Sequence, residues 1–287
     1  GLTMFIGTAL SISLYLIGFA ENFLGIGFIR ELTGLGETVN DYRIVGTVTV
    51  VILFFIAFIG TSVAIKTQFF IMAAIALSLL SVVAGFFFQE SVPESPSIWP
   101  ATDSLPFEVV FAIFFPAVTG FTAGVAMSGD LKDPRKNIPF GTLSAIVVGL
   151  IVYVSLSVGL AYFVDRDLML ADNNFLMKIA WFGPLVVAGI WGATLSSAIG
   201  GWVGAPRILQ AISKDKITPK FFSKGYGINN EPRNALFFTL ILAESGILIG
   251  ELDVIASIVS MFYIAAYGFI NIAFALEKWA STDFRPS

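Results

Sequence analysis

Eight apolar runs of membrane-spanning length follow one another along this chain, separated by short connections. They cover residues 2–29, 44–65, 69–88, 107–128, 140–164, 181–211, 234–250 and 253–276. A helix needs about 20 apolar residues to cross a bilayer, whereas a membrane barrel shows short segments of alternating polarity. A mean hydropathy of +0.87 and a charged fraction of 13% agree with residence in a membrane. The sequence therefore predicts an all-α membrane protein with about eight transmembrane helices.

The basic residues are distributed unevenly among the connections. If the first helix starts in the cytoplasm, 12 of the 16 Lys and Arg residues lie on the cytoplasmic side. Cytoplasmic loops of membrane proteins carry an excess of Lys and Arg, so this orientation is favoured over its inverse. It makes the proline-rich connection 91–106 an outer linker, and it makes 212–233 a short cytoplasmic interfacial element. The chain also starts directly inside an apolar run, which indicates a fragment.

Several function classes find no support in the composition. The sequence contains no Cys and no His, which excludes disulfides, thiolate metal sites and histidine relays. It has no Gly-Lys-Ser/Thr phosphate loop and no acid–base or nucleophile constellation. We therefore expect no enzyme, no cofactor, no metal beyond transported ions, and no nucleic acid partner.

One apolar run, 107–128, is interrupted in its middle. Pro116 removes a backbone donor, and Gly120 and Gly124 follow within about two turns. An unpaired backbone group in hydrocarbon costs several kcal/mol, so such a break is tolerable only inside protein or beside a wet cavity. Its freed carbonyls can replace the water around a cation, and the N–H groups that open the second half-helix can hold an anion. The alternative is a proline kink that only shapes packing.

Two hydroxyls share one face of the run 181–211. Ala193, Ser196 and Ser197 stand at helical spacings i, i+3 and i+4, and hard oxygen ligands suit a hard cation such as Na⁺. The alternative is that small residues at these positions merely let two helices approach closely.

Acids and tyrosines within apolar runs form a further group of candidates. Glu21 lies toward the outer end of the first helix and has no obvious basic partner in this chain, and Glu244 has no assigned role. Tyr15 and Tyr267 each add a hydroxyl that can complete an ion's coordination, although tyrosine in membrane proteins is more often an interfacial anchor.

Several of these segments carry a resemblance to a known family. The stretch FAIFFPAVTGFTAGVAMSGDLKDPRKNIPFGTL resembles the sixth helix and following loop of the cation–chloride cotransporters, and it is joined by NDYRIVGTVTVVIL, GATLSSAI, APRILQAISKDKI and KGYGINNEP. The family belongs to the amino-acid–polyamine–organocation superfamily. The resemblance implies a five-plus-five inverted-repeat, LeuT-like fold in one transport domain, 1–287. The eight helices would be the third to tenth of twelve, with 1–90 from the first repeat and 107–276 from the second.

The resemblance also implies roles for individual residues. A potassium site would use Tyr15, Pro116 and Thr119. A chloride site would use Gly120, Phe121, Thr122 and Tyr267. A sodium site would use Ala193, Ser196 and Ser197. Glu21 would be an outer-gate acid that pairs with an arginine of the family's first helix, which would explain its missing partner.

The paired serines resemble the sodium-coupled branch, and a tyrosine rather than a histidine at position 15 resembles its potassium-carrying members. The resemblance thus implies electroneutral Na⁺–K⁺–Cl⁻ symport by alternating access in a plasma membrane. The short outer loop 165–180 fits a microbial member, and a homodimer would form through parts outside this chain. K–Cl or Na–Cl cotransport, an amino-acid permease, a channel and a non-transporting scaffold remain the alternatives.

Overall fold

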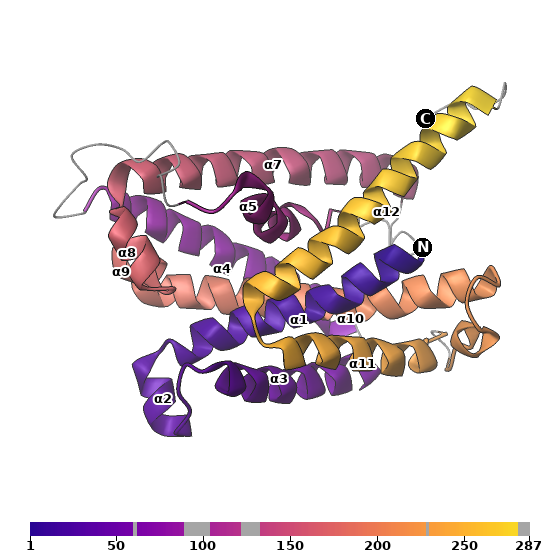
Figure 1. Ribbon diagram of the computed structural model, residues 1–287, viewed down its shortest axis with the longest axis horizontal. Helices are drawn as coiled ribbons and strands as arrows, with labels where there is room; N and C mark the ends of the chain where they lie inside the picture. The colour runs from indigo at the N-terminus through magenta and orange to yellow at the C-terminus, as the bar shows by residue number, and fades with distance from the viewer. Residues whose placement is uncertain (60–61, 89–103, 122–132, 228–229, 281–287) are drawn as a thin grey trace.

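A computed structural model describes residues 1–59, 62–88, 104–121, 133–227 and 230–280, and these residues form helices joined by short connections (Figure 1). The helices are α1 (Leu2–Leu24), α2 (Gly27–Thr33), α3 (Val39–Ile59), α4 (Ser62–Phe86), α5 (Phe107–Phe114), η1 (Phe115–Val118), α7 (Pro134–Phe163), α8 (Arg166–Ala171), α9 (Phe175–Ile179), α10 (Gly183–Lys214), η3 (Lys220–Ser223), α11 (Arg233–Ile249) and α12 (Leu252–Ala280). The described residues contain one isolated β-bridge, Tyr226 with Glu231.

Six helices among the described residues are long and apolar enough to cross a membrane: α1, α3, α4, α7, α10 and α12. The two remaining predicted spans are not among these six long helices, each for its own reason. The run from Phe107 is divided into α5 and η1, and α11 has only 17 residues and carries Glu244 in its interior. The multi-pass helical architecture predicted from the sequence is confirmed.

Several long helices run along the length of the molecule, α12 crosses them obliquely, and α5 lies near the middle (Figure 1). The elements α2, α8 and α9 lie at one end, whereas the N-terminus and the connection from α10 to α11 lie at the other. This is the alternation expected when successive spans cross the membrane in opposite directions. The first end is the outer side of the predicted orientation, and the second is the cytoplasmic side.

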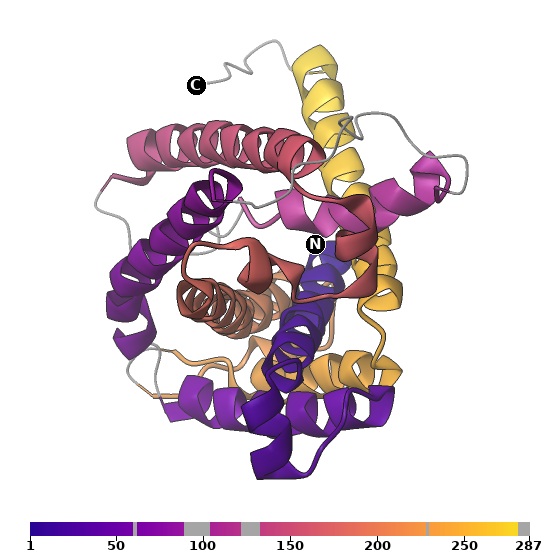
Figure 2. The ribbon, with the colours of Figure 1, turned by 90° about the vertical axis from the view of Figure 1, so that its left-hand side faces the viewer.

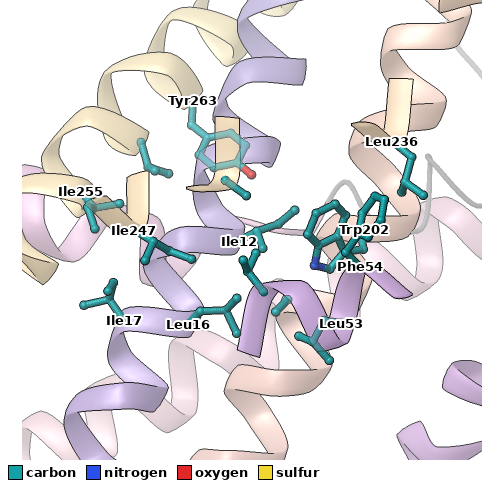
Figure 3. Packing of buried hydrophobic residues seen from close by; sticks show 14 residues of the cluster. Ile12, Leu16, Ile17, Leu53, Phe54, Trp202, Leu236, Ile247, Ile255 and Tyr263 are labelled. Carbon is teal, nitrogen blue, oxygen red and sulfur yellow. The ribbon is translucent and has the colours of Figure 1, made fainter. Parts of the chain in front are cut away.

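Helix α1 occupies the centre of the packed region, in contact with α3, α10, α11 and α12. Residues all around α1 are buried, because it is covered by neighbours on every side. Its residues Ile12 and Leu16 meet Trp202 of α10 and Ile247 of α11 in the main hydrophobic cluster (Figure 3). Side-chain packing around α1 therefore holds α3, α10, α11 and α12 together.

Glycines allow two of these contacts to be very close. A Cβ built on Gly201 of α10 would lie 2.6 Å from Ile12, and one on Gly246 of α11 would lie 2.2 Å from the Ser13 Oγ. Ser13 also donates a hydrogen bond of 2.8 Å to the carbonyl of Ala243. Small residues at helix crossings and side-chain hydrogen bonds are the usual means of joining helices in a membrane.

Helix α7 is packed very differently from α1, although both are apolar. Gly159 is the one buried residue of α7 within the described part, and its backbone is covered by the Phe86 ring of α4. Figure 2 shows α7 running along one side of the molecule, away from α3 and α11. The face that α7 turns toward the interrupted span therefore borders open space rather than a packed core.

Candidate ion-binding site

The interruption in the run from Phe107 lies where the proline predicts it. The α-helix ends at Phe114, a 3-10 turn spans Phe115–Val118, and Thr119 is extended with φ −95° and ψ −176°. Gly120 then has φ +90°, a conformation that residues with a Cβ rarely adopt. The second half-helix expected after this glycine, including Gly124 and the chloride-site candidate Thr122, lies outside the described residues.

Side chains from two other helices satisfy backbone carbonyls that the break leaves without a helical partner. Pro116 has no N–H for the carbonyl of Ala112, and Ser260 of α12 donates a hydrogen bond of 2.5 Å to that oxygen. The Tyr153 hydroxyl of α7 donates to the carbonyl of Ala117 at 2.8 Å. The break is thus built into the contacts between helices, as the cost of unpaired groups in hydrocarbon requires.

Two oxygens of the predicted potassium site lie next to each other in the turn. The Thr119 Oγ1 is 2.7 Å from the carbonyl oxygen of Pro116, which also accepts the Thr119 N–H at 3.1 Å. The Tyr15 side chain, from α1, packs against the hydrophobic cluster that also receives Phe115 and Tyr267. A carbonyl, a hydroxyl and a phenol of these kinds are ligands suited to a weakly hydrated cation.

Aromatic rings connect the predicted potassium and chloride positions. Tyr267 of α12 stacks on Phe121, with ring centroids 5.2 Å apart, and on Tyr263, with centroids 5.7 Å apart. The hydroxyl of Tyr15 lies within electrostatic range of the Tyr263 and Tyr267 hydroxyls. The structure therefore brings Tyr15, Phe121 and Tyr267 into one neighbourhood, although they come from three segments far apart in sequence.

A cavity of about 720 Å³ lies between the interrupted segment and α7, which also touch each other through Tyr153. Thr119, Gly120 and Phe121 line it on one side, and Tyr153 and Ser157 are among the α7 residues on the other. A Cβ built on Gly120 would meet no atom within 4 Å. The backbone at the break therefore borders a cavity whose lining is mostly apolar, with Thr119, Tyr153 and Ser157 as its polar side chains.

The sodium-site candidates share one face of α10 and differ in their exposure. Ala193 and Ser196 are half-buried, whereas Ser197 is exposed. One turn further on, a Cβ on Gly200 would meet nothing within 4 Å. Neither serine hydroxyl makes a hydrogen bond within the described part of the chain. Close approach through small residues is seen at Gly201 of α10, which contacts α1, and at Gly189 and Gly192, which contact α4.

Glu21 lies near the outer end of α1, half-buried, with Asp253 and Tyr42 as electrostatic neighbours. It forms no ion pair with any residue that the structure describes. A carboxylate in this position lacks the partner that a membrane acid normally has.

A buried amide beside Glu21 was missed in the sequence analysis. Asn22 donates a hydrogen bond of 2.5 Å to the Asn174 Oδ1 and accepts one of 2.9 Å from the Trp191 Nε1. Asn22 thereby joins the outer ends of α1 and α10 to the short segment between α8 and α9. An asparagine inside an apolar run was the available signal, because a buried amide must find partners.

The segment between α8 and α9 is itself fixed by a charged pair outside the membrane spans. The Lys178 ammonium is 2.6 Å from the Asp172 carboxylate, which also accepts the N–H of Asn174 at 2.7 Å. The ammonium first, and the backbone N–H second, hold the pKa of the Asp172 carboxyl below its usual value.

Helical spans around an interrupted segment are an arrangement that occurs in multi-pass secondary transporters. Comparison with known proteins agrees: a family profile described as "Amino acid permease" matches residues 2–287, and the chain belongs to that family. This assignment and the helical spans confirm the predicted inverted-repeat, LeuT-like fold class and the prediction of a transporter rather than an enzyme.

Individual relatives show which members of the family this chain is similar to. Solute carrier family 12 member 2 of Mus musculus is 35% identical over 343 aligned residues, which cover all of this chain and 28% of that protein. Solute carrier family 12 member 1 of Mus musculus is 33% identical over 346 residues, covering all of this chain and 31% of that protein. The member 2 protein of Squalus acanthias is 32% identical. These matches confirm the resemblance to the cation–chloride cotransporters, and the chain spans about three-tenths of the length of these relatives.

Proposed function

We propose that the full-length protein is a secondary active symporter of inorganic ions in the plasma membrane, coupling Na⁺, K⁺ and Cl⁻ by alternating access. The observation that carries the proposal is the interruption at Pro116–Gly120, which borders a cavity and whose residue Phe115 packs against the same hydrophobic cluster as Tyr15 and Tyr267. Its chemistry consists of carbonyls, hydroxyls and N–H groups, which bind small ions without any carboxylate or imidazole ligand.

Potassium would bind between Tyr15, the carbonyl of Pro116 and the hydroxyl of Thr119. The last two oxygens are already neighbours in the turn. On binding, the Thr119 hydroxyl would turn its proton away from the Pro116 oxygen, so that both oxygens face the cation. The cost of dehydrating K⁺ is lower than that of Na⁺, which suits a site made of a few neutral oxygens.

Chloride would bind on the other side of the glycine, at the N–H groups of Gly120, Phe121 and Thr122, with the Tyr267 hydroxyl as a further donor. The stacking of Tyr267 on Phe121 supports this assignment, because it holds the phenol next to the backbone concerned. Backbone N–H groups at the start of a helix favour an anion.

Sodium would bind at Ala193, Ser196 and Ser197, and Glu21 would act as the outer gate. The exposure of Ser197 and the absence of an ion-pair partner for Glu21 within the described residues support the two roles. Balanced charge would make transport insensitive to membrane potential, since each uncompensated charge costs about 2.3 kcal/mol per 100 mV.

The test is Rb⁺ uptake, as a tracer for K⁺, by the full-length protein in liposomes, with Na⁺ and Cl⁻ removed in turn. The proposal predicts that uptake falls to background in both cases. Persistence without Na⁺ would identify a K–Cl cotransporter, and persistence without Cl⁻ would contradict cation–chloride coupling.

An amino-acid permease is the second candidate, favoured by the description of the matching family profile. In that case the N–H groups after Gly120 would hold a substrate carboxylate instead of chloride. Unlabelled amino acids at millimolar concentration would then reduce Rb⁺ uptake or be taken up themselves. We expect neither.

A further inference from the structure

The connection between α10 and α11 presents lysines and large apolar side chains together on its surface. Lys214, Lys216 and Lys220 are exposed, and Ile217 and Phe221, which alternate with them, are 67% and 63% exposed. The one acid between Lys214 and Lys224 is Asp215. Two large apolar side chains exposed to water are unfavourable in a solvated charged loop, so we expect a contact that covers them.

The connection is firmly held against the helices on either side of it. The Ser213 Oγ donates a hydrogen bond of 2.6 Å to the carbonyl of Pro219. The Asn234 Nδ2 donates one of 2.8 Å to the carbonyl of Phe221. The Phe222 ring packs on Phe238 of α11, with centroids 5.3 Å apart. Because Phe222 occupies the inward position, its neighbour Phe221 points outward from a fixed backbone.

These contacts fix the depth of the connection relative to the membrane. Helix α11 begins at Arg233, and its 17 residues extend about 26 Å, slightly less than the hydrocarbon thickness of about 30 Å. With α11 taken as the span that the sequence predicts over 234–250, its first turn would lie at the cytoplasmic boundary of the bilayer. Phe221 is bonded to that first turn through Asn234, so it lies at the same level. Figure 1 shows the connection at the end of the molecule where the N-terminus lies.

We propose that the surface formed by Lys214, Lys216, Ile217, Lys220 and Phe221 docks on the cytoplasmic leaflet and binds anionic phospholipids. The ammonium groups would pair with lipid phosphates, and Ile217 and Phe221 would enter the boundary between headgroups and acyl chains. Basic side chains beside a membrane are attracted to anionic lipid, and apolar residues at this depth bury their surface in it. The surface is remote from the interruption, and the inference does not depend on which ions are carried.

The experiment measures binding of a short-chain fluorescent phosphatidylserine to the purified full-length protein in a neutral detergent. Replacing two lysines, K216Q with K220Q, should weaken binding severalfold, because it removes two of the ammonium groups that would pair with the lipid phosphate. F221A should weaken it severalfold. The matched control is R135Q with K136Q, which removes two exposed cytoplasmic charges from the first turn of α7 and should change binding less than twofold. All these side chains are exposed, so an unchanged gel-filtration profile will show that the variants are folded.

Three outcomes would overturn the proposal. The first is equal weakening by the α7 control, which would indicate a general charge effect. The second is competition by glycerophosphoserine, which has no acyl chains, at an affinity equal to that of the lipid and unaffected by F221A. That result would indicate a phosphate site rather than a lipid surface. The third is a cross-link from Lys220 to another segment of the full chain without lipid binding, which would assign the surface to a protein contact.

Discussion

Helix α1 and the interrupted segment α5–η1 are both apolar, yet they are used in opposite ways. Twelve of the 23 residues of α1 are buried, and it is continuous from Leu2 to Leu24. The interrupted segment buries only Pro116 among the residues from Phe107 to Val118, and its regular helix ends after two turns. Hydropathy alone does not separate them. The difference lies in how many neighbours surround each one.

The two elements also contribute different chemical groups to the candidate site. The packed helices α1 and α12 hold Tyr15 and Tyr267 in fixed positions, so they supply side-chain hydroxyls. The interrupted segment supplies backbone carbonyls and N–H groups. In a continuous helix these groups would be occupied by intrahelical hydrogen bonds. A site of this kind needs both sets of elements: α1 and α12, here called the rigid side, and the interrupted segment, here called the irregular side. The predictions below test each side separately.

The largest effect is expected at Gly120, on the irregular side. Gly120→Ala places a Cβ at φ +90°, which strains the backbone by about 1–3 kcal/mol although the space around it is open. We expect a loss of Rb⁺ uptake of more than tenfold in the full-length protein. Gly149→Ala is the matched control, because Gly149 lines the same cavity from inside a regular helix and also faces open space. Equal loss in both variants would contradict the role of the Gly120 conformation.

The next effect tests the rigid side. Tyr15→His should abolish Rb⁺ uptake while leaving Na⁺-dependent Cl⁻ uptake in place, because the phenol is assigned to potassium alone. The measurement is uptake of both tracers in one set of liposomes. Parallel loss of the two fluxes would show that Tyr15 supports the fold of the site rather than its potassium selectivity.

A smaller effect is expected where the two sides meet. Ser260→Ala removes the hydrogen bond to the Ala112 carbonyl and leaves that oxygen unsatisfied, which costs about 1–3 kcal/mol. The thermal midpoint should fall and uptake should decrease severalfold. Ser257→Ala is the control, since its exposed hydroxyl bonds only to Asp253 of its own helix and its loss should leave both quantities nearly unchanged.

The smallest effect concerns Asp172, at the outer end of the packed side. Its carboxyl pKa is lowered in the folded protein, so its contribution to stability is present above the unfolded pKa of about 4 and is lost as pH falls through the folded value. Because the pair with Lys178 is largely exposed, Asp172→Asn should lower stability by only about 0.2–1 kcal/mol at pH 7. The difference from wild type should shrink steadily as pH falls below about 4, measured by thermal unfolding. A difference that grows as pH falls would contradict this assignment.

The sequence predicted the spans and the interruption, because both depend on local chemistry. Membrane-length apolar runs must become helices, and Pro116 must release the Ala112 carbonyl. The sequence did not predict the end of the first helix, expected near residue 29 and found at Leu24, where the chain turns at Gly25 and packs directly on Asn174. Nor did it predict that Ser260 would bond to Ala112, since this contact joins residues 148 positions apart. Contacts of that kind depend on the arrangement of whole helices.

Our central claim is that the interruption forms the ion site together with the tyrosines. Its most direct test is the location of Rb⁺ by anomalous scattering in crystals of the full-length protein grown with Na⁺, Rb⁺ and Cl⁻. We predict one Rb⁺ peak within coordination distance of the Tyr15 hydroxyl, the Pro116 carbonyl and the Thr119 Oγ1. A fully occupied Rb⁺ peak elsewhere, with the space beside Pro116 empty or filled by an organic substrate, would contradict the account.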